Sequence, residues 1–118
     1  TIADTGLQQQ IEIFELVQRR TGRTPPIVDA RDVLTDPRRS LGLLCEALGV
    51  LFDESMLRWP PGRRDTDGVW APHWYAAVEK STGFETYRQK VEAVPASLRR
   101  LLDECVEHYE RLAAQAIR

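Results

Sequence analysis

The sequence lacks the short motifs by which many phosphate, metal and nucleophile sites are recognised. It contains no GxxxxGK(S/T) loop, no GxGxxG turn, no paired CxxC, no HExxH helix and no GxSxG elbow. The two histidines, His73 and His108, lie far apart and have no cysteine at a metal-ligand spacing. We therefore expect no bound metal, and the catalytic residues stay unknown at this level.

Several classes of partner are disfavoured by what the composition lacks. Sixteen basic against eighteen acidic residues give a formal net charge of -2, so the positive field that non-specific nucleic-acid binding needs is absent. No apolar run approaches the roughly 20 residues that span a bilayer. The first residues, Thr-Ile-Ala-Asp, have neither the basic nor the apolar part of a signal peptide. We expect a cytoplasmic protein that binds neither nucleic acid nor membrane.

Cysteine and methionine are both scarce. Cys45 and Cys105 each lie within an apolar helical stripe, where a free cysteine behaves as a small hydrophobic residue. We expect two reduced structural thiols, with a single bridge as the weaker alternative. The only methionine is Met56, which fits a processed or excised chain, although removal of an initiator residue explains it equally.

The composition and the apolar periodicity of the sequence predict a mainly helical segment. Hydrophobic residues make up 42% and charged residues 29% of the 118 residues, as in an ordinary globular protein. A chain of this length forms one small domain or part of a larger one, so residues 1–118 are treated as a single segment. Apolar periodicity and capping residues predict helices near residues 5–21, 37–48, 53–57 and 95–116, and a short helix that ends near residue 80.

One short stretch has the composition of a β-strand. Residues 27–30, Ile-Val-Asp-Ala, begin with β-branched side chains and follow two prolines that no helix crosses. No other segment indicates a strand, and a solitary strand leaves backbone donors and acceptors unpaired on both edges. We therefore expect its partners to lie outside these residues or in a second copy of the chain.

A loop rich in proline, glycine and arginine is expected at residues 58–68. In it Arg63 and Arg64 follow Gly62, and a glycine beside basic residues lets guanidinium and backbone N–H groups approach a phosphate or sulfate. Asp65 and Asp67 are close enough in sequence to neutralise both arginines instead. A solvated, self-paired loop is at least as well supported as an anion site.

Aromatic residues cluster just after this loop. Trp70, His73 and Trp74 could form a wall for a planar or apolar substrate, and histidine suits proton transfer near neutral pH. Aromatic clusters most often simply pack, so a small satellite core with a satisfied histidine is the favoured alternative. His108 lies beside the apolar stripe of the last helix and is expected to be structural.

Several short sequences occur in a fixed order along the chain. They are Pro-Ile-Val-Asp-Ala-Arg-Asp-Val-Leu-Thr-Asp-Pro at 26–37, Leu-Cys-Glu-Ala-Leu-Gly-Val at 44–50, Phe-Asp at 52–53, Trp-Pro-Pro-Gly-Arg-Arg at 59–64, the aromatic stretch at 70–75 and Ser-Thr-Gly-Phe at 81–84. In this order and spacing they resemble a late passage of the sulfotransferase family, in particular of bacterial sulfotransferase-like proteins. The resemblance covers nearly the whole chain.

The resemblance implies a P-loop-type α/β fold, of which this chain would be the carboxy-terminal, mainly α part with one short strand. It implies transfer of a sulfuryl group from 3'-phosphoadenosine-5'-phosphosulfate to a hydroxyl or amine. The family's phosphosulfate loop precedes the matched passage, so the segment alone is expected to be inactive. Gly62, Arg63 and Arg64 correspond to a late basic loop that completes the cofactor site, although the order Pro-Pro-Gly-Arg-Arg differs from the usual Arg-Lys-Gly.

Two classes of function remain open. The first is an enzyme part, whose partner would be the missing amino-terminal portion. The second is a helical interaction or dimerisation module without catalysis, in which an apolar helix face docks on a partner or on a second copy of the chain. A DNA-binding helical domain is less well supported because acidic and basic residues nearly balance.

Overall fold

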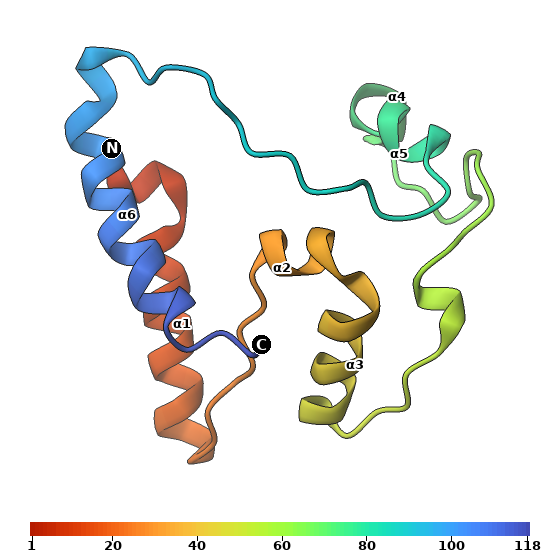
Figure 1. Ribbon diagram of the computed structural model, residues 1–118, viewed down its shortest axis with the longest axis horizontal. Helices are drawn as coiled ribbons and strands as arrows, with labels where there is room; N and C mark the ends of the chain where they lie inside the picture. The colour runs from red at the N-terminus through yellow and green to blue at the C-terminus, as the bar shows by residue number, and fades with distance from the viewer.

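The computed structural model describes residues 1–118 and is mainly helical (Figure 1). Its only β-structure consists of two isolated bridges, one parallel between Ile27 and Ala116 and one antiparallel between Arg58 and Gly83. No helix has the length and apolar character needed to cross a membrane. The helices in chain order are η1 Ile2–Thr5, α1 Leu7–Thr21, α2 Ala30–Thr35, α3 Pro37–Leu48, η2 Glu54–Met56, α4 Ala71–Trp74, α5 Ala76–Lys80, η3 Ala96–Leu98 and α6 Arg99–Ala113.

Local sequence signals set the carboxy-terminal end of α1 and both ends of α3, as predicted, whereas α1 begins at Leu7, later than predicted, because residues 2–5 form the separate helix η1. Helix α1 ends at Gly22, which has φ 67° and donates its N–H to a carbonyl of the last turn. Helix α3 begins after Asp36, whose Oδ1 accepts the Arg39 N–H at 3.0 Å, and Pro37 occupies its first position. It ends at Gly49 with φ 68°. Each signal acts within about one helical turn, so no distant contact is needed to place these ends.

The predicted strand at residues 27–30 is wrong beyond its first residue. Ala30 begins helix α2 because the Asp29 carboxylate caps it, with Oδ1 accepting the Arg31 N–H at 2.9 Å. Only Ile27 takes part in β-structure, through its bridge to Ala116, and its carbonyl accepts a backbone N–H of the carboxy-terminal tail at 2.9 Å. The chain's own tail therefore pairs with this segment on one side.

Helices α1 and α6 lie side by side and run in the same direction (Figure 1). Ile11, on the predicted apolar face of α1, is buried, and it lines a small cavity together with Leu112 of α6. An ion pair between Glu15 and Arg111 joins the two helices one turn further along. The apolar faces predicted for these two helices therefore meet in the structure.

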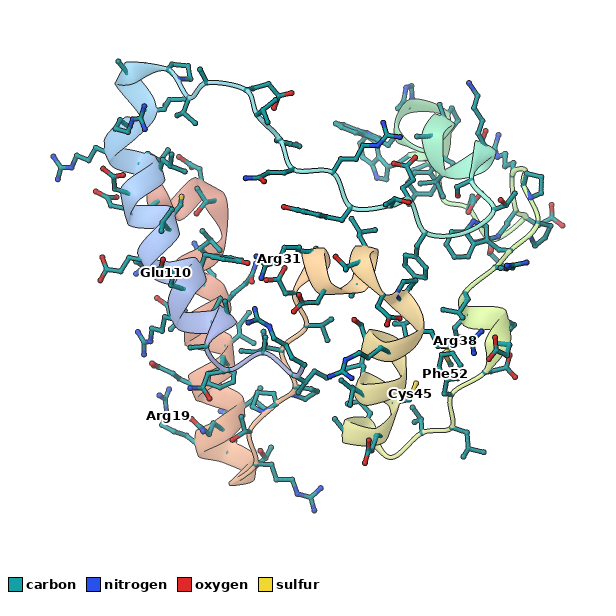
Figure 2. All side chains as sticks on the ribbon, in the orientation of Figure 1. Arg19, Arg31, Arg38, Cys45, Phe52 and Glu110 are labelled. Atoms are coloured by element: carbon teal, nitrogen blue, oxygen red, sulfur yellow. The ribbon has the colours of Figure 1, made fainter.

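Helix α3 packs against the segment that follows it. Cys45 is buried, with its Sγ 3.9 Å from Met56 Sδ, and both cysteines of the chain are free thiols, as predicted. An ion pair between Arg38 and Glu54 fastens η2 to the start of α3. Figure 2 shows Arg38, Cys45 and Phe52 gathered between α3 and this segment. These contacts hold the entrance of the following loop close to α3.

Few residues of the chain are buried. Only four of the 118 residues are buried. Among the apolar residues, Leu51 is 93% exposed and Val91 is 91% exposed. The accessible surface is 9666 Å², against about 6,500 Å² for a compact monomer of this mass. The radius of gyration is 17.0 Å, against about 13–14 Å for a compact chain of this length. The molecule is therefore open, and several apolar faces lack a cover.

A buried carboxylate ties α6 and the carboxy-terminal tail to α2. The Asp29 side chain is 7% exposed and accepts a hydrogen bond from the Tyr109 hydroxyl, while Arg118 Nη2 lies 3.8 Å away. Arg118 Nε also donates to Asp32 Oδ2 at 2.9 Å. Burial opposes ionisation of Asp29, but the hydrogen bonds from Tyr109 and the Arg31 N–H, with the nearby guanidinium groups, outweigh it and lower the pKa of Asp29.

Replacing Asp29 by asparagine is expected to lower the free energy of unfolding by about 1–2 kcal/mol at neutral pH, because charge-assisted hydrogen bonds are lost while asparagine still caps α2. The folded-state pKa lies below the ordinary value of 3.8, so the contribution is complete above that value and disappears as pH falls through the folded-state pKa. Urea unfolding followed by circular dichroism at several pH values measures this difference.

The control is Asp103→Asn on the exposed side of α6, a carboxylate without a hydrogen bond or ion pair. Its effect on the free energy of unfolding should stay small at every pH. A stability difference between wild type and Asp29→Asn that persists unchanged at the lowest pH would contradict the assignment.

Candidate functional site

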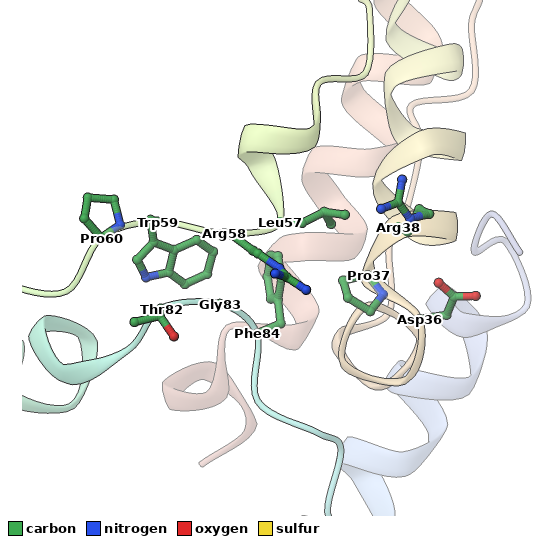
Figure 3. Close-up of a pocket in the computed structure, with 10 residues that line it drawn as sticks. All are labelled: Asp36, Pro37, Arg38, Leu57, Arg58, Trp59, Pro60, Thr82, Gly83 and Phe84. Carbon is green, nitrogen blue, oxygen red and sulfur yellow. The ribbon is translucent and has the colours of Figure 1, made fainter.

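An open cleft lies between the start of α3 and two extended segments that flank the predicted loop (Figure 3). Its volume is about 740 Å³. The first wall is the start of α3, the second is the chain directly after η2, and the third is the Ser-Thr-Gly-Phe sequence after α5. The lining residues are Asp36, Pro37, Arg38, Leu57, Arg58, Trp59, Pro60, Thr82, Gly83 and Phe84.

Hydrogen bonds hold the aromatic wall of the cleft in position. The indole Nε1–H of Trp59 donates to Ser81 Oγ at 2.9 Å, and the Ser81 hydroxyl donates to the Val78 carbonyl at 2.7 Å. The Trp59 ring meets Phe84 edge to face, with centroids 5.4 Å apart and planes at 82°. The backbone N–H of Trp59 donates to the Thr82 carbonyl at 3.1 Å. The orientation of the indole is therefore determined within the fold.

Gly83 permits the close approach of the two extended segments. It forms the antiparallel bridge with Arg58, and a Cβ atom at this position would lie 3.1 Å from the Leu57 carbonyl oxygen. That separation is tighter than ordinary van der Waals contact, so a Cβ atom would require the Leu57 carbonyl to shift by a few tenths of an ångström. Glycine at this position lets the two segments approach without such a shift.

Arg58 is the cation of the cleft that forms no ion pair. The Arg38 guanidinium pairs with Glu54, a hydrogen bond that raises the pKa of Arg38 and lowers the pKa of Glu54. The Asp36 carboxylate is engaged as the cap of α3. No ion pair of the structure includes Arg58. An anion that enters the cleft would therefore meet an available guanidinium group.

The predicted basic loop continues from the cleft wall. Gly62 has φ 113°, a conformation that favours glycine, and its N–H donates to the Glu79 carbonyl at 2.6 Å, so this donor is already engaged. Arg63 and Arg64 are exposed and form no ion pair, whereas Asp67 Oδ2 accepts the backbone N–H of Arg64 at 2.9 Å. The loop is thus closed by a backbone contact, and both guanidinium groups face solvent.

The predicted aromatic residues share one helical turn outside the cleft. The backbone N–H groups of His73 and Trp74 donate to the Trp70 carbonyl at 3.0 and 3.1 Å, so the three positions lie on one face of α4. Trp70 is 66% and Trp74 73% exposed, and no ring of the chain stacks on either. The structure therefore does not contain the packed satellite core that was the favoured alternative.

Sequence reasoning missed three residues of the cleft, Arg58, Trp59 and Phe84. It used the sequences around Trp59 and Phe84 for their order along the chain and placed the candidate cations further along, at Arg63 and Arg64. The sequence does contain a signal for Arg58. It lies between the apolar residues Leu57 and Trp59, and apolar side chains that pack at the start of a loop keep the residue between them near the folded part of the chain. Whether Arg58 can bind a ligand depends on which arginine pairs with Glu54, and the sequence alone does not show that pairing.

Comparison with known proteins identifies the family. The model of the family described as sulfotransferase domain matches residues 2–116 of this chain. The chain belongs to the sulfotransferase domain family. The cleft and the loop beside it both lie within residues 2–116, the part of the chain that matches the family.

Two curated relatives are proteins of Arabidopsis thaliana named branched-chain-amino-acid aminotransferase-like protein 2 and protein 1. Each is 36% identical to the chain over 110 residues, or 92% of its length, and the match covers 19% and 20% of the relatives. The chain thus spans about a fifth of the length of these relatives. No solved structure matches it.

Replacing Ser81 by alanine should make the Trp59 indole in the aromatic wall of the cleft more mobile. The Trp59 Nε1–H loses its acceptor, so its exchange with solvent deuterium, followed by nuclear magnetic resonance, is expected to accelerate about fivefold. The exposed indoles of Trp70 and Trp74 serve as internal references. Ser97→Ala, at an exposed serine of η3 without a side-chain hydrogen bond, should leave all three rates unchanged. Equal rates in wild type and Ser81→Ala would show that the hydrogen bond does not hold the indole.

Proposed function

We propose that this chain is the part of a sulfotransferase that supplies cations to the sulfuryl donor and an aromatic surface to the acceptor. The donor would be 3'-phosphoadenosine-5'-phosphosulfate and the acceptor a hydroxyl or amine. The observation that carries the proposal is an arginine that forms no ion pair, Arg58, in an aromatic-walled cleft of a sulfotransferase domain.

The charge pattern of the cleft supports an anionic ligand. Two arginines, Arg38 and Arg58, and one carboxylate, Asp36, line the cleft. Arg38 pairs with Glu54 and the Asp36 carboxylate accepts the Arg39 N–H, so Arg58 is the guanidinium group that an incoming anion could bind. A phosphate or sulfate group can accept two hydrogen bonds from one guanidinium group, a geometry that lysine does not offer. The same group would meet the rings of Trp59 and Phe84, which suit the planar base of a nucleotide.

The basic loop extends this proposed donor site. Arg63 and Arg64 lie five and six residues beyond Arg58, are exposed, and have no carboxylate partner. Gly62 would act through its backbone conformation, because its N–H is already donated within the fold. The loop would approach the donor from outside the cleft, where solvent weakens each interaction. Arg58 is also exposed, but it stands beside the ring of Trp59, whose position the contacts with Ser81 and Phe84 fix, so we assign it the larger share of donor affinity.

The exposed face of α4 is proposed as the acceptor surface. Trp70 and Trp74 are mostly exposed, and His73 lies on the same helical turn. A planar or apolar acceptor could lie against the indoles while the imidazole accepts a proton from its hydroxyl or amine. Proton removal in this position would prepare the oxygen or nitrogen for attack on the sulfur atom of the donor. As the new bond to sulfur forms, the bond between sulfur and the 5'-phosphate oxygen breaks and adenosine 3',5'-bisphosphate leaves.

The segment alone is proposed to be inactive. Sulfuryl transfer needs several fixed donors around the moving group, and an open cleft with one available guanidinium does not enclose that group. The remaining donors would come from another part of the protein, which would also cover the exposed apolar faces. The aminotransferase-like names of the two relatives are not carried over to this chain, because the match covers only about a fifth of those proteins.

Arg58→Ala in the full-length protein is expected to weaken binding of adenosine 3',5'-bisphosphate by about 10- to 100-fold, because a charge-assisted hydrogen-bonded contact is lost. The variant Arg63→Ala with Arg64→Ala should weaken it less, by about two- to fivefold. Titration calorimetry measures both.

The matched control for these variants is Arg88→Ala, at an exposed arginine outside the cleft and the loop. It should bind like the wild type. Wild-type affinity in Arg58→Ala would remove the cleft from the donor site, and wild-type affinity in the double variant would remove the loop.

Trp70→Ala with Trp74→Ala is expected to raise KM for the acceptor about tenfold while leaving the affinity for adenosine 3',5'-bisphosphate unchanged, because stacking surface is lost only on the acceptor side. Both side chains are mostly exposed, so the free energy of unfolding should change little. Steady-state kinetics with varied acceptor measures the effect. An unchanged KM would place the acceptor elsewhere.

A further inference from the structure

Glu54 is the carboxylate that neighbours both arginines of the cleft. The two terminal nitrogens of Arg38 donate to its two oxygens, with Nη2 at 2.6 Å from Oε2, so the ion pair is bidentate. The hydrogen bond from Arg38 lowers the pKa of Glu54, and the nearby charge of Arg58 also lowers it. Arg38 and Arg58 enter the cleft from different segments, the start of α3 and the chain after η2 (Figure 3). One carboxylate therefore controls how much positive charge a ligand of the cleft can use.

Contacts within the chain hold Glu54 in this place. Helix η2, which carries it, begins after Asp53, whose Oδ1 accepts the Ser55 N–H at 2.7 Å. Met56, at the other end of η2, lies with its Sδ 3.9 Å from the Sγ of the buried Cys45 of α3. The position of Glu54 beside the cleft thus follows from neighbouring segments of the chain itself.

This arrangement leaves a doubly charged ligand without a second cation. Asp36 also lines the cleft, so an anion bound to Arg58 would have a second carboxylate near it besides Glu54. The guanidinium group of Arg58 can pair with one negative charge of the anion. A second negative charge would stay unpaired close to carboxylates that repel it, because Arg38 is already engaged.

Sulfate and phosphate groups differ in this charge. A sulfate ester carries one negative charge over the whole range of pH in which proteins are usually folded. A terminal phosphate carries about −1.5 to −2 at pH 7, because its second pKa lies near 6. The two groups share a tetrahedral shape and three terminal oxygens that accept hydrogen bonds. Charge is therefore the property by which a protein site can best tell them apart.

We propose that Glu54 is a positioning residue that makes the cleft prefer a singly charged sulfate group over a doubly charged phosphate group. By holding Arg38, Glu54 leaves one guanidinium group, that of Arg58, for the ligand. A phosphate still binds Arg58, but less tightly. This inference rests on the proposed function, since it takes the cleft as part of the donor site, and it adds that the sulfuryl group is the part of the donor that suits the cleft best.

Adenosine 5'-phosphosulfate and adenosine 5'-diphosphate test this preference, because they differ in whether the terminal group is a sulfate or a phosphate. Titration calorimetry with the full-length protein is expected to show that wild type binds the phosphosulfate about tenfold more tightly. Glu54→Gln releases Arg38, so the diphosphate should gain about tenfold in affinity while the phosphosulfate changes by less than about threefold. The rest of the protein is the same in wild type and variant, so the change in the ratio of affinities reports on Glu54.

The matched control is Glu46→Gln, at an exposed glutamate of α3 that forms no ion pair. It removes the same charge from the same face-to-face pair of segments without touching the cleft. The wild-type ratio of the two affinities should be kept.

The pH dependence gives a readout that a purely structural role of Glu54 would not produce. Lowering the pH from about 7.5 to about 5.5 protonates the terminal phosphate, so the diphosphate should bind wild type about fivefold more tightly, whereas the phosphosulfate should not change. In Glu54→Gln the diphosphate should instead bind less tightly at the lower pH, because its second charge there meets Arg38. The charged groups around Glu54 are Arg38, Arg58 and Asp53. Glu54 and Asp53 stay ionised in this range, since hydrogen bonds from Arg38 and from Ser55 lower their respective pKa values.

The outcomes separate this inference from the proposed function. Equal affinities of the two nucleotides in wild type, or a ratio that Glu54→Gln leaves unchanged, would overturn the inference alone. A folded Glu54→Gln variant, checked by circular dichroism, that loses affinity for both nucleotides equally would also overturn it, because Glu54 would then only hold the wall. Absence of binding of either nucleotide to wild type would overturn the proposed function as well. The wild-type ratio and its pH dependence need no variant, so a misfolded Glu54→Gln still leaves the proposal open to refutation.

Discussion

The buried carboxylate of Asp29 is the interaction on which the arrangement of the chain depends. One of its oxygens begins α2, and the other accepts the Tyr109 hydroxyl of α6. Arg118 of the tail lies against the same carboxylate and against Asp32. A single carboxylate thus links the start of α2 to Tyr109 of α6, and the short connection at Asp36 leads from α2 into α3, which provides one wall of the cleft.

The cleft itself depends on a second, smaller set of contacts. Trp59 and Ser81 lock the two extended segments together, and Gly83 allows them to approach. Because Arg38 is held by Glu54, Arg58 is the guanidinium group of the cleft that forms no ion pair. The open form of the chain around this cleft, with a surface of 9666 Å², leaves it incomplete as an enclosed reaction site.

Much of the helical fold could be predicted from the sequence, and the errors have a common cause. Asp36-Pro37, Gly22 and Gly49 act on their nearest neighbours, so the helix ends they predict are found. The strand at residues 27–30 failed because strand propensity is expressed only when a partner is present, whereas Asp29 caps a helix without one. The exposure of Trp70 and Trp74 was missed for the same reason, since packing depends on a neighbour that the local sequence does not supply.

The sequence by itself determined the family, through the order of its short segments, and the helix ends, through capping and glycine positions that act within one turn. Only the tertiary structure decided which arginine is available to a ligand. Arg38 and Arg58 look alike in the sequence, but Glu54 forms its ion pair with Arg38, and the charge of Arg58 acts on Glu54 without an ion pair between them. Ion pairing requires the two charges to meet in space, and residues far apart in the chain meet only after the chain has folded.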